Sequence, residues 1–434
     1  MRTLAVLLND DRVGTLHESN DLWSFEYDEQ WAKGPDAFDL SPALSRATVR
    51  HEDGASDRPV QWYFDNLLPE EQLRQAVSKD AKLDAEDAFA LLQYLGAESA
   101  GSLVLQSPDA PARAREGLKP LPNEELSQRI RNLPRMTLSH GAPKRMSVAG
   151  AQEKLLVVLR DGALFEPRGA EPSTHILKPN HVADDYPATV INEYLVMRLA
   201  AERGLRVPDV FRRYVPEPVY IVKRFDRFMD GSGATQRLHI IDACQLLNKA
   251  RTFKYAAATL QTLTQLVGQC RNRASTRLRL YQWLVFNVLV GNHDNHLKNL
   301  SFMVGKEGIE LAPAYDLLGT AAYHTRAFAG DRADWPRVEM AIALPDAPTF
   351  DSVTRTAVLA AGRALGLSTG ISSRELDRMA RGLAPALDHL IEEFEQQSAE
   401  LSEEARRFLG AERHLTGTLR HVVVPEMLGR IAHE

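Results

Sequence analysis

Cysteine is scarce in this chain of 434 residues, which contains only Cys244 and Cys270. Two thiols do not make a disulfide framework for a chain of this length, so the sequence favours a reducing compartment. Long apolar runs are also missing, because none approaches the roughly 20 residues that span a membrane. The apolar run at residues 4–8 lacks the long hydrophobic region and the cleavage site of a signal peptide. We therefore expect a cytoplasmic protein without a membrane partner.

A surplus of positive charge is missing as well, since the formal net charge is −6. Binding of nucleic acid over the whole surface is therefore disfavoured. A local basic patch stays open at Arg271, Arg273, Arg277 and Arg279, although a solvated helix face is the more frequent explanation for such a cluster. Repeats and low-complexity tracts are absent. A hydrophobic content of 44% is typical of a globular protein, and the length allows two or three domains.

The first 140 residues are typical of a small α+β unit without a catalytic constellation. Alternating apolar residues predict strands at 4–8, 13–16, 22–27 and 103–105. Helical spacing predicts helices from residue 60, over 69–83 and over 85–95. The prolines at 108, 111, 120 and 122 predict a linker over 107–122, and a helix over 123–133 leads to a domain boundary near residue 140. The segment 66–69 is interpreted as a helix end followed by proline.

A loop of small residues opens the second part of the chain, after Ser147. Its central glycine would let backbone N–H groups approach a phosphate, although the loop is not G-x-G-x-x-G and a packed turn is the plain alternative. The candidate nucleotide-binding residues of the loop are Val148, Ala149, Gly150, Ala151 and Gln152. Strands are predicted at 155–159, at 164–165 after the turn Asp161-Gly162, and at 174–178.

Lys178 ends the last of these strands, where a kinase small lobe carries a phosphate-contacting lysine. A lysine on an edge strand is the alternative. Glu193, on a helix predicted over 187–204, is a candidate partner for this lysine, and a solvated glutamate is equally compatible. The strand at 219–227 turns polar at its end, as expected of a hinge between lobes. Backbone groups near Lys223 are candidates for binding adenine, Phe225 for packing on the ring and Asp226 for contacting the ribose hydroxyls.

A polar loop at 291–299 lies between two apolar runs, and the rest of the chain is organised around it. Asp294 and Asn299 have the D-x-x-x-x-N spacing of a kinase catalytic loop. The aspartate must reach the acceptor hydroxyl, and the asparagine must reach a metal ion on the phosphates. Asp316 follows a hairpin predicted over 300–311 and is the expected main Mg²⁺ ligand.

Other interpretations of this loop stay open. His293 and His296 have the spacing of a zinc pair, but zinc sites usually need a third or fourth protein ligand. Lys298 is either solvated or placed to steady charge on the transferring phosphoryl group. Beyond Asp316 the sequence predicts a loop at 330–336, helices at 351–366, 373–398 and 403–413, and a weakly patterned tail after residue 415.

The chain resembles the HipA family of bacterial serine/threonine-kinase toxins. The resemblance is carried by the segments 147–154, 174–178, 224–227 and 294–299, together with Tyr315-Asp316, and the stretch 64–69 also matches. It implies an α+β, protein-kinase-like fold of two lobes behind a small N-terminal α+β subdomain. The expected segments are 1–140 for the subdomain and linker, 141–226 for the small lobe and 227–434 for the mainly helical large lobe.

The resemblance also implies roles for individual residues, with ATP and Mg²⁺ as cofactors. Asp294 would be the catalytic base with Lys298 beside it, Asn299 and Asp316 would bind the metal, and Lys178 and His296 would contact the nucleotide. Ser147 matches the position of autophosphorylation, which ejects the loop and inactivates the kinase. Lys223 and Asn295 depart from residues found in some members, but neither change removes a role-bearing group.

Two kinds of partner are implied by the same resemblance. One is a protein substrate, such as an aminoacyl-tRNA synthetase, whose phosphorylation arrests growth. The other is a small helix-turn-helix antitoxin, through which the kinase reaches operator DNA and represses its own operon. A small-molecule phosphotransferase and an inactive kinase fold that serves only as co-repressor remain as alternatives. The presence of Lys178, Asp294, Asn299 and Asp316 together argues against the inactive fold.

Overall fold

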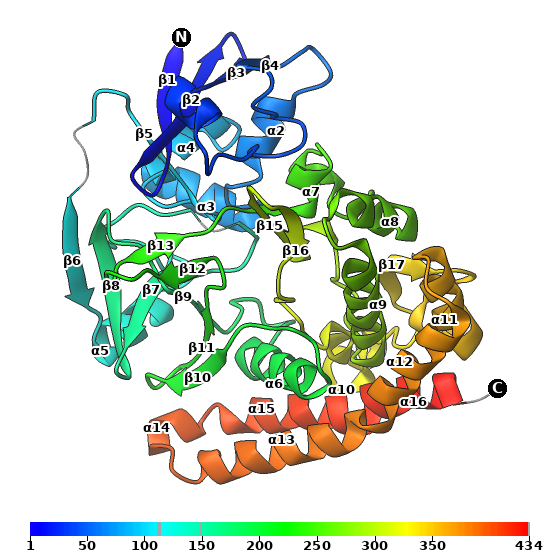
Figure 1. Cartoon of the computed structure of the whole chain (residues 1–434). Helices are drawn as coiled ribbons and strands as arrows, with labels where there is room; N and C mark the ends of the chain where they lie inside the picture. Colours follow the sequence, from blue (N-terminus) through cyan, green and yellow to red (C-terminus); the bar gives the residue numbers. More distant parts are fainter. Residues whose placement is uncertain (111–113, 148, 433–434) are drawn as a thin grey trace. The chain divides into compact units, whose positions relative to one another are not determined.

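The computed structural model describes residues 1–110, 114–147 and 149–432. It divides into two compact units, which are described separately (Figure 1). Unit 1 consists of Met1–Lys178, Val222–Phe253 and Ser301–Ala312, and unit 2 consists of Pro179–Ile221, Lys254–Leu300 and Pro313–Glu434. The predicted segment 1–140 lies within unit 1, and the chain enters each unit three times.

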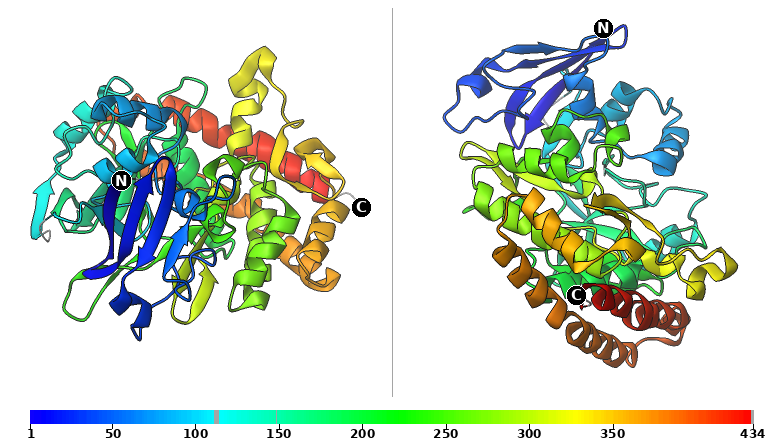
Figure 2. Two further views of the ribbon diagram at one scale, coloured as in Figure 1. Left: turned by 90° about the horizontal axis from the view of Figure 1, so that it is seen from above. Right: turned by 90° about the vertical axis from the view of Figure 1, so that its right-hand side faces the viewer.

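An antiparallel five-stranded sheet opens unit 1 (Figure 2). Its strand order is β4-β3-β2-β1-β5, with bounds Arg50–Glu52, Leu22–Tyr27, Asp11–Ser19, Arg2–Leu8 and Leu103–Gln106. All four strands predicted for this part are therefore confirmed. Side chains of alternate strand residues form the core with helices α2 (Pro59–Asp65) and α4 (Ala88–Leu95), and Trp23 meets Phe89 edge to face with ring centroids 5.2 Å apart. Helices α1 (Glu29–Lys33) and α3 (Glu71–Ala81) complete this region.

A second sheet of unit 1 has neighbouring strands in the order β9-β7-β8-β6, with bounds His175–Pro179, Leu155–Arg160, Ala163–Gly169 and Arg115–Pro120. The predicted turn between β7 and β8 is confirmed, since Asp161 and Gly162 have φ angles of 51° and 76°. The prediction of a linker over 107–122 is wrong for its second half, because β6 pairs with β8. Pro120 is the last residue of β6, a position where the missing N–H interrupts no ladder. Helix α5 (Asn123–Arg131) follows as predicted.

Smaller sheets complete unit 1. The hairpin of β12 (Arg227–Met229) and β13 (Thr235–Arg237) turns at Asp230, whose carboxylate accepts hydrogen bonds from the backbone of Ser232 and Ala234. The sheet β14-β15-β16 joins Ile240–Asp242 to the hairpin Ser301–Gly305 and Gly308–Leu311, which confirms the hairpin predicted over 300–311. Helix α7 (Ala243–Leu246) is a single turn before the 3-10 turn η1 (Arg251–Phe253).

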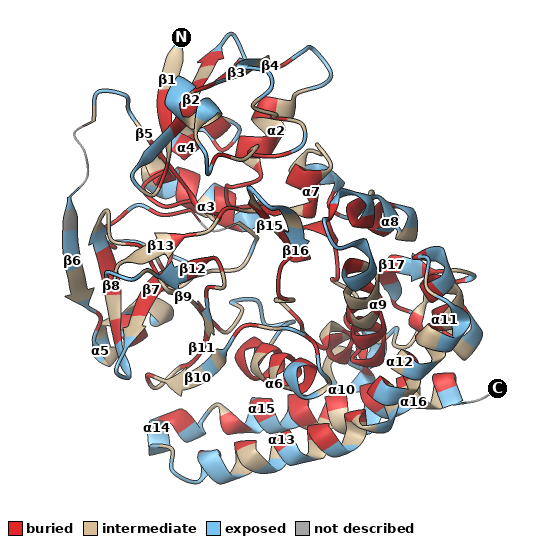
Figure 3. Ribbon diagram, viewed as in Figure 1, coloured by how far each residue is buried: buried red, intermediate tan, exposed pale blue. Residues whose placement is uncertain are grey.

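Unit 2 is mainly helical. Its longer helices are α6 (Thr189–Glu202), α8 (Leu260–Gln269), α9 (Arg273–Leu289), α11 (Arg355–Ala364), α12 (Thr369–Arg381), α13 (Leu383–Ser398), α15 (Leu409–Thr418) and α16 (Val424–Ala432). Its shorter elements are β10 (Val210–Tyr214), β11 (Pro218–Lys223, which ends in unit 1), α10 (Arg326–Ala329), β17 (Glu339–Leu344), β18 (Ala347–Thr349) and α14 (Glu403–Arg406). The single helix predicted over 373–398 is wrong, because Gly382 separates α12 from α13. The second half of α9, which leads to the polar loop, is almost entirely buried (Figure 3).

The tail after residue 415 is a continuous helical segment, so the prediction of a weakly patterned tail is wrong. A π-helical turn at Leu419–Val423 joins α15 to α16. The buried side chains recur every fourth residue, at Leu415, Leu419, Val423, Met427 and Ile431. This spacing is wider than the 3.6 residues per turn of an α-helix, and a wider π turn keeps the apolar stripe on one face.

Membrane-spanning candidates were sought among the helices of the described residues. None of these helices is long and apolar enough to cross a membrane.

His239 supplies a test of the packing in unit 1. The ring is buried, with Nδ1 2.8 Å from the Ser102 hydroxyl and Nε2 2.9 Å from the Leu40 carbonyl oxygen. Burial lowers its pKa to about 4. The unfolded chain binds a proton below its ordinary pKa of about 6.5, and the folded chain does not until the pH is far lower. We predict that the free energy of unfolding decreases as the pH is lowered from about 6.5 to about 4. Urea titrations of the wild type and of His239→Gln check this, since equal pH slopes would contradict it.

Candidate active site

The predicted site residues fall in both units. Unit 2 holds Glu193, Asp294, His296, Lys298, Asn299 and Asp316. Unit 1 holds Ser147, Ala149, Gly150, Ala151, Gln152, Lys178, Lys223, Phe225 and Asp226. Val148 lies outside the described residues.

Two buried asparagines, through hydrogen bonds, connect the end of helix α9 to the polar loop of unit 2. The Asn287 side chain donates to the Trp283 carbonyl over 2.8 Å and accepts from the Asn292 amide over 2.7 Å. The Asn292 oxygen in turn accepts the backbone N–H of Asp294 over 3.1 Å. Because an amide side chain both donates and accepts, this chain of bonds satisfies the backbone at the helix end and fixes the start of the loop.

Gly291 lets the loop approach the C-terminal helical segment. Its φ of 65° is left-handed, and a Cβ at this position would lie 2.6 Å from Cγ1 of Val423. Gly319, in the segment after Asp316, is equally confined, since its Cβ would lie 2.3 Å from Cδ2 of Leu419. Both contacts are made by the π-helical turn. The part of the chain that looked weakly patterned therefore supports both loops that carry the predicted catalytic and metal-binding residues.

Hydrogen bonds within the D-x-x-x-x-N segment close it into a turn. The Asn299 amide donates to the Asp294 carbonyl oxygen over 2.8 Å, and the backbone N–H of His296 donates to the same oxygen over 3.0 Å. The 3-10 turn η2 (Leu297–Asn299) follows, and the Tyr315 hydroxyl donates to the Lys298 carbonyl over 2.7 Å. Lys298 is buried, so the solvated alternative for this lysine is wrong.

Acidic side chains gather around Asp294. Burial raises its pKa, the negative charge of Asp316 raises it further, and His296, Tyr255 and Lys254 oppose the shift. Burial likewise raises the pKa of Tyr220, together with the charges of Glu193 and Asp316. Glu193 itself is buried on α6, so it is not the solvated glutamate of the alternative interpretation. Unit 2 thus brings Glu193, Asp294 and Asp316 into one electrostatic neighbourhood.

Asp316 has a left-handed backbone, with φ of 57°. Non-glycine residues with positive φ are uncommon and gather at functional sites. The following segment is tied to α6, because Asn192 accepts the Gly319 N–H over 2.7 Å and donates to the Tyr323 hydroxyl over 3.2 Å. The chain therefore leaves Asp316 along a fixed path.

The donor set of unit 2 fits Mg²⁺ better than zinc. Asp316 offers carboxylate oxygens, and the bond from the Asn299 nitrogen leaves the amide oxygen as its cation-binding end. Mg²⁺ is usually held by one or two carboxylates together with waters and substrate phosphates. Within residues 1–110, 114–147 and 149–432, no three His, Cys, Asp or Glu side chains are grouped to hold a metal. The His293 ring meets His324 edge to face, and the zinc interpretation lacks its third ligand.

The small-residue loop of unit 1 and the preceding Ser147 are hydrogen-bonded to the N-terminal subdomain. The Ser147 hydroxyl donates to the Leu67 carbonyl over 2.5 Å, and its backbone N–H donates to the Glu98 carbonyl over 2.8 Å. Gly150 has φ of 103°, and its carbonyl accepts from the Glu70 N–H over 3.2 Å. The segment 66–69, interpreted as a helix end, is thus also a contact surface for this loop.

The remaining candidates of unit 1 differ in exposure. Lys178 is buried at the end of β9, and β9 is not an edge strand of its sheet, so the alternative of a lysine on an edge strand is wrong. Lys223 is exposed, and Phe225 is half-buried. These positions are compatible with the predicted contacts to phosphate and adenine, which stay predictions.

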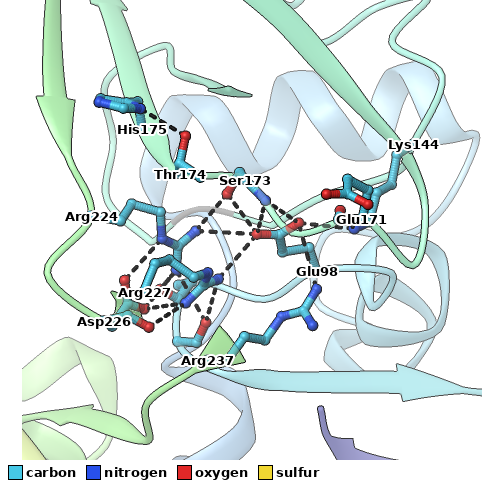
Figure 4. A network of polar contacts seen from close by, with 12 residues as sticks. Glu98, Lys144, Glu171, Ser173, Thr174, His175, Arg224, Asp226, Arg227 and Arg237 are labelled. Atoms are coloured by element: carbon cyan, nitrogen blue, oxygen red, sulfur yellow. Dashed lines mark hydrogen bonds and ion pairs between the residues drawn. The ribbon is translucent and has the colours of Figure 1, made fainter. Parts of the chain in front are cut away.

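Asp226 belongs to a buried ion network centred on Glu98 (Figure 4). Arg224 donates to both Asp226 oxygens over 3.0 and 2.8 Å, and Arg227 donates to one of them over 2.7 Å. A contact with ribose would have to use the same oxygens. The structure therefore gives Asp226 a structural role, and its predicted contact with ribose stays without support.

Glu98 is fully buried, and its contacts join several separate segments of unit 1. Its carboxylate lies 2.9 Å from Nζ of Lys144 and 3.0 Å from Nη2 of Arg227, and it accepts from the backbone and hydroxyl of Ser173. Burial opposes ionisation, but Lys144, Arg227, Arg237 and Arg224 outweigh it and hold the Glu98 pKa well below its usual range. The sequence analysis missed Glu98. One signal could have pointed to it. The arginines of the Arg224–Arg227 segment follow an apolar strand, so they need a buried anion as partner.

Comparisons with known proteins place these observations in a family. The model of the HipA-like C-terminal domain matches residues 146–406, and the model of the HipA N-terminal domain matches residues 4–106. This chain belongs to the HipA family. The resemblance found in the sequence is thereby confirmed.

Individual HipA relatives agree with the family assignment. The serine/threonine-protein kinase toxin HipA of Shewanella oneidensis is 29% identical over 412 residues, which cover 90% of this chain and 89% of that protein. The Sinorhizobium fredii protein Y4mE is 36% identical over 310 residues, which cover 69% of this chain and 72% of that protein. A solved complex of S. oneidensis HipA, HipB and operator DNA matches with a TM-score of 0.77 at 27% identity, covering 98% of this chain and 99% of that one. The expected α+β, kinase-like HipA fold is therefore confirmed.

The ion network of this HipA-family chain predicts a large loss of stability for Glu98→Gln. The variant keeps the shape of the side chain but removes the negative charge that buried Lys144 faces and one of the carboxylates that buried Arg227 contacts. Breaking a buried ion pair in this way costs about 3–5 kcal/mol. Urea unfolding of the purified chain measures the change. The matched control is Glu29→Gln, which removes a solvent-exposed partner of Lys33 and should leave the midpoint unchanged. Equal midpoints for Glu98→Gln and wild type would contradict the prediction.

Proposed function

We propose that this chain is an ATP-dependent serine/threonine protein kinase that acts as the toxin of a toxin–antitoxin pair. One observation supports the kinase assignment most directly. Unit 2 places Asp294 in a closed D-x-x-x-x-N turn, beside a second carboxylate, Asp316, on a backbone of unusual conformation. Relatives named as kinases, among them HipA of S. oneidensis, support the same activity.

Asp294 is the proposed catalytic base. It orients the acceptor hydroxyl and takes its proton as the oxygen bonds to the γ-phosphorus and the bond from that phosphorus to the leaving oxygen of ADP breaks. Burial raises its pKa, which makes it a stronger proton acceptor than an exposed carboxylate. Lys298 and Lys178 steady the charge of the phosphates. Asn299 and Asp316 are the proposed Mg²⁺ ligands, and bound Mg²⁺ would neutralise charge on the phosphates.

The proposed nucleotide contacts lie mostly in unit 1. The backbone of the loop 149–152 would face the phosphates, the backbone at Lys223 would meet adenine, and Phe225 would pack on the ring. His296 of unit 2 is the further proposed contact. The positive φ of Gly150 supports this assignment, because it turns the loop in a way that exposes backbone N–H groups.

Ser147 is the proposed site of autophosphorylation. Ser147 is only 2% exposed, and its hydroxyl donates a hydrogen bond to the Leu67 carbonyl. A phosphoserine has no proton to donate there at neutral pH and adds negative charge next to a carbonyl oxygen. Phosphorylation therefore requires the loop to leave this position and disfavours its return, which would inactivate the enzyme.

The proposed partners follow from the matched structure. S. oneidensis HipA is seen there with HipB and operator DNA. We infer that this chain binds a small helix-turn-helix antitoxin of the HipB kind and reaches operator DNA through it, which supports co-repression. The proposed substrate is a component of translation, such as an aminoacyl-tRNA synthetase, whose phosphorylation would arrest growth.

Replacement of the two key carboxylates tests the activity. Purified chain with Mg²⁺ and radiolabelled ATP is expected to incorporate label at Ser147, located by mass spectrometry. Asp294→Asn removes the proton acceptor and should lower the rate by about 100-fold to 10,000-fold. Asp316→Ala removes the main metal ligand and should abolish transfer.

Asp388→Asn serves as the control, because it removes a partly exposed carboxylate that pairs with Arg420 on the helical surface. It should retain the wild-type rate. Full activity of Asp294→Asn or Asp316→Ala would overturn the kinase assignment. Turnover that depends on a metabolite, without a phosphoprotein, would identify a small-molecule phosphotransferase. No turnover in a sample that binds ATP and starts unphosphorylated would favour a co-repressor alone.

A further inference from the structure

A tyrosine outside the D-x-x-x-x-N motif contacts the proposed catalytic base. Tyr255 lies in unit 2, between η1 and α8, and its hydroxyl donates to Oδ1 of Asp294 over 2.5 Å. The Tyr255 ring meets His296 edge to face, with centroids 4.8 Å apart, and Nζ of Lys254 lies 5.2 Å from the ring centroid. The phenol is therefore held against the catalytic loop.

The backbone around Tyr255 is held by hydrogen bonds, whereas its side chain is partly exposed to solvent. The Lys254 carbonyl accepts the backbone N–H of Leu297 over 3.1 Å, and the Tyr255 carbonyl accepts from Ala258 over 2.8 Å. Tyr255 is nevertheless 46% exposed. Rotation of its ring away from Asp294 would open no gap in the core, because the residue is already partly exposed to solvent.

Asp294 does not depend on this tyrosine for its place in the loop. Its backbone N–H is bound by Asn292, and its carbonyl is bound by Asn299 and by the backbone of His296. The bond from Tyr255 reaches only the carboxylate, which is the end that does the chemistry. A hydroxyl that donates to this oxygen makes the same bond that an acceptor hydroxyl must make before phosphoryl transfer.

We propose that the Tyr255 hydroxyl occupies the acceptor position on Asp294 in the substrate-free protein and is displaced by the acceptor. This inference rests on the proposed kinase function and deepens it. The acceptor is a serine or threonine hydroxyl on a polypeptide, whose neighbouring residues compensate for the displaced ring. Water, which brings no such neighbours, is kept from the base. Tyr255 is thus a specificity-determining residue that suppresses hydrolysis of ATP.

The consequence for kinetics follows from competition for one oxygen atom. If the tyrosine holds Asp294 about nine-tenths of the time, an acceptor binds about tenfold more weakly than it would to a vacant base. Removing the hydroxyl while keeping the ring should lift this competition for the acceptor without changing the chemical step.

Tyr255→Phe in the full chain tests the proposal. One assay follows ADP release with Mg²⁺-ATP alone, in which a water oxygen bonds to the γ-phosphorus, the bond to the ADP oxygen breaks and the proton passes to Asp294. The other follows label transfer to a synthetic peptide of residues 141–154, which contains Ser147. We expect hydrolysis to rise about tenfold and the KM for the peptide to fall about tenfold, with kcat within about twofold.

Two further variants make the test specific. Tyr186→Phe is the matched control, since this tyrosine of unit 2 is 41% exposed and lies outside the loop, and it should leave both assays unchanged. Tyr255→Ala removes the ring as well and should hydrolyse ATP at least as fast as Tyr255→Phe. Rates of Asp294→Asn are subtracted throughout, so that only turnover through this base is compared.

The outcomes separate the two proposals. Hydrolysis by Tyr255→Phe that equals or falls below wild type overturns the role of Tyr255. A lower kcat with an unchanged KM also overturns it, because the tyrosine would then position the base and not compete for it. If wild type labels neither Ser147 nor the peptide, the kinase assignment fails, while the comparison of hydrolysis rates still decides the role of Tyr255.

Discussion

The buried carboxylate of Glu98 is the interaction on which unit 1 depends. It compensates Lys144, Arg224 and Arg227, which come from segments far apart in the sequence. A buried charge is costly to desolvate, so these segments are held where their charges are mutually satisfied. The same residue binds the backbone of Ser147 through its own carbonyl. The backbone of Glu98 therefore holds Ser147, which precedes the small-residue loop, while its side chain holds the ion network.

Unit 2 holds the backbone of its polar loop in a different way. Neutral amides of Asn192, Asn287 and Asn292 hold the backbone on both sides of the acidic residues. Amides bind backbone groups without adding charge next to the carboxylates of Asp294 and Asp316.

The sequence predicted much of this architecture because its signals are local. Strand alternation, the Asp161-Gly162 turn and the D-x-x-x-x-N spacing each depend on neighbouring residues, and the family resemblance supplied their order. What the sequence did not show depends on contacts between distant residues. The partners of Glu98 lie up to 139 positions away, at Arg237. Neither Tyr255 nor Asn192 belongs to a motif. Asp226 looked like a ligand contact because it follows a buried strand that turns polar, as expected of a hinge. Strand β6 was missed because prolines and charges masked an edge strand.

The π-helical turn at Leu419–Val423 has a consequence for how the chain can vary. A π turn contains one residue more than the α-helical turn it replaces, so its presence fixes the helical phase of everything that follows. Loss of a single residue here would restore regular α geometry and rotate α16 by about 100° relative to α15. Leu419 and Val423 would then no longer face Gly319 and Gly291 together. The segment lies beyond residue 406, where the match to the HipA-like C-terminal domain ends. Its length in residues, more than the identity of its side chains, is thus under constraint from the loops that contain Gly291 and Gly319.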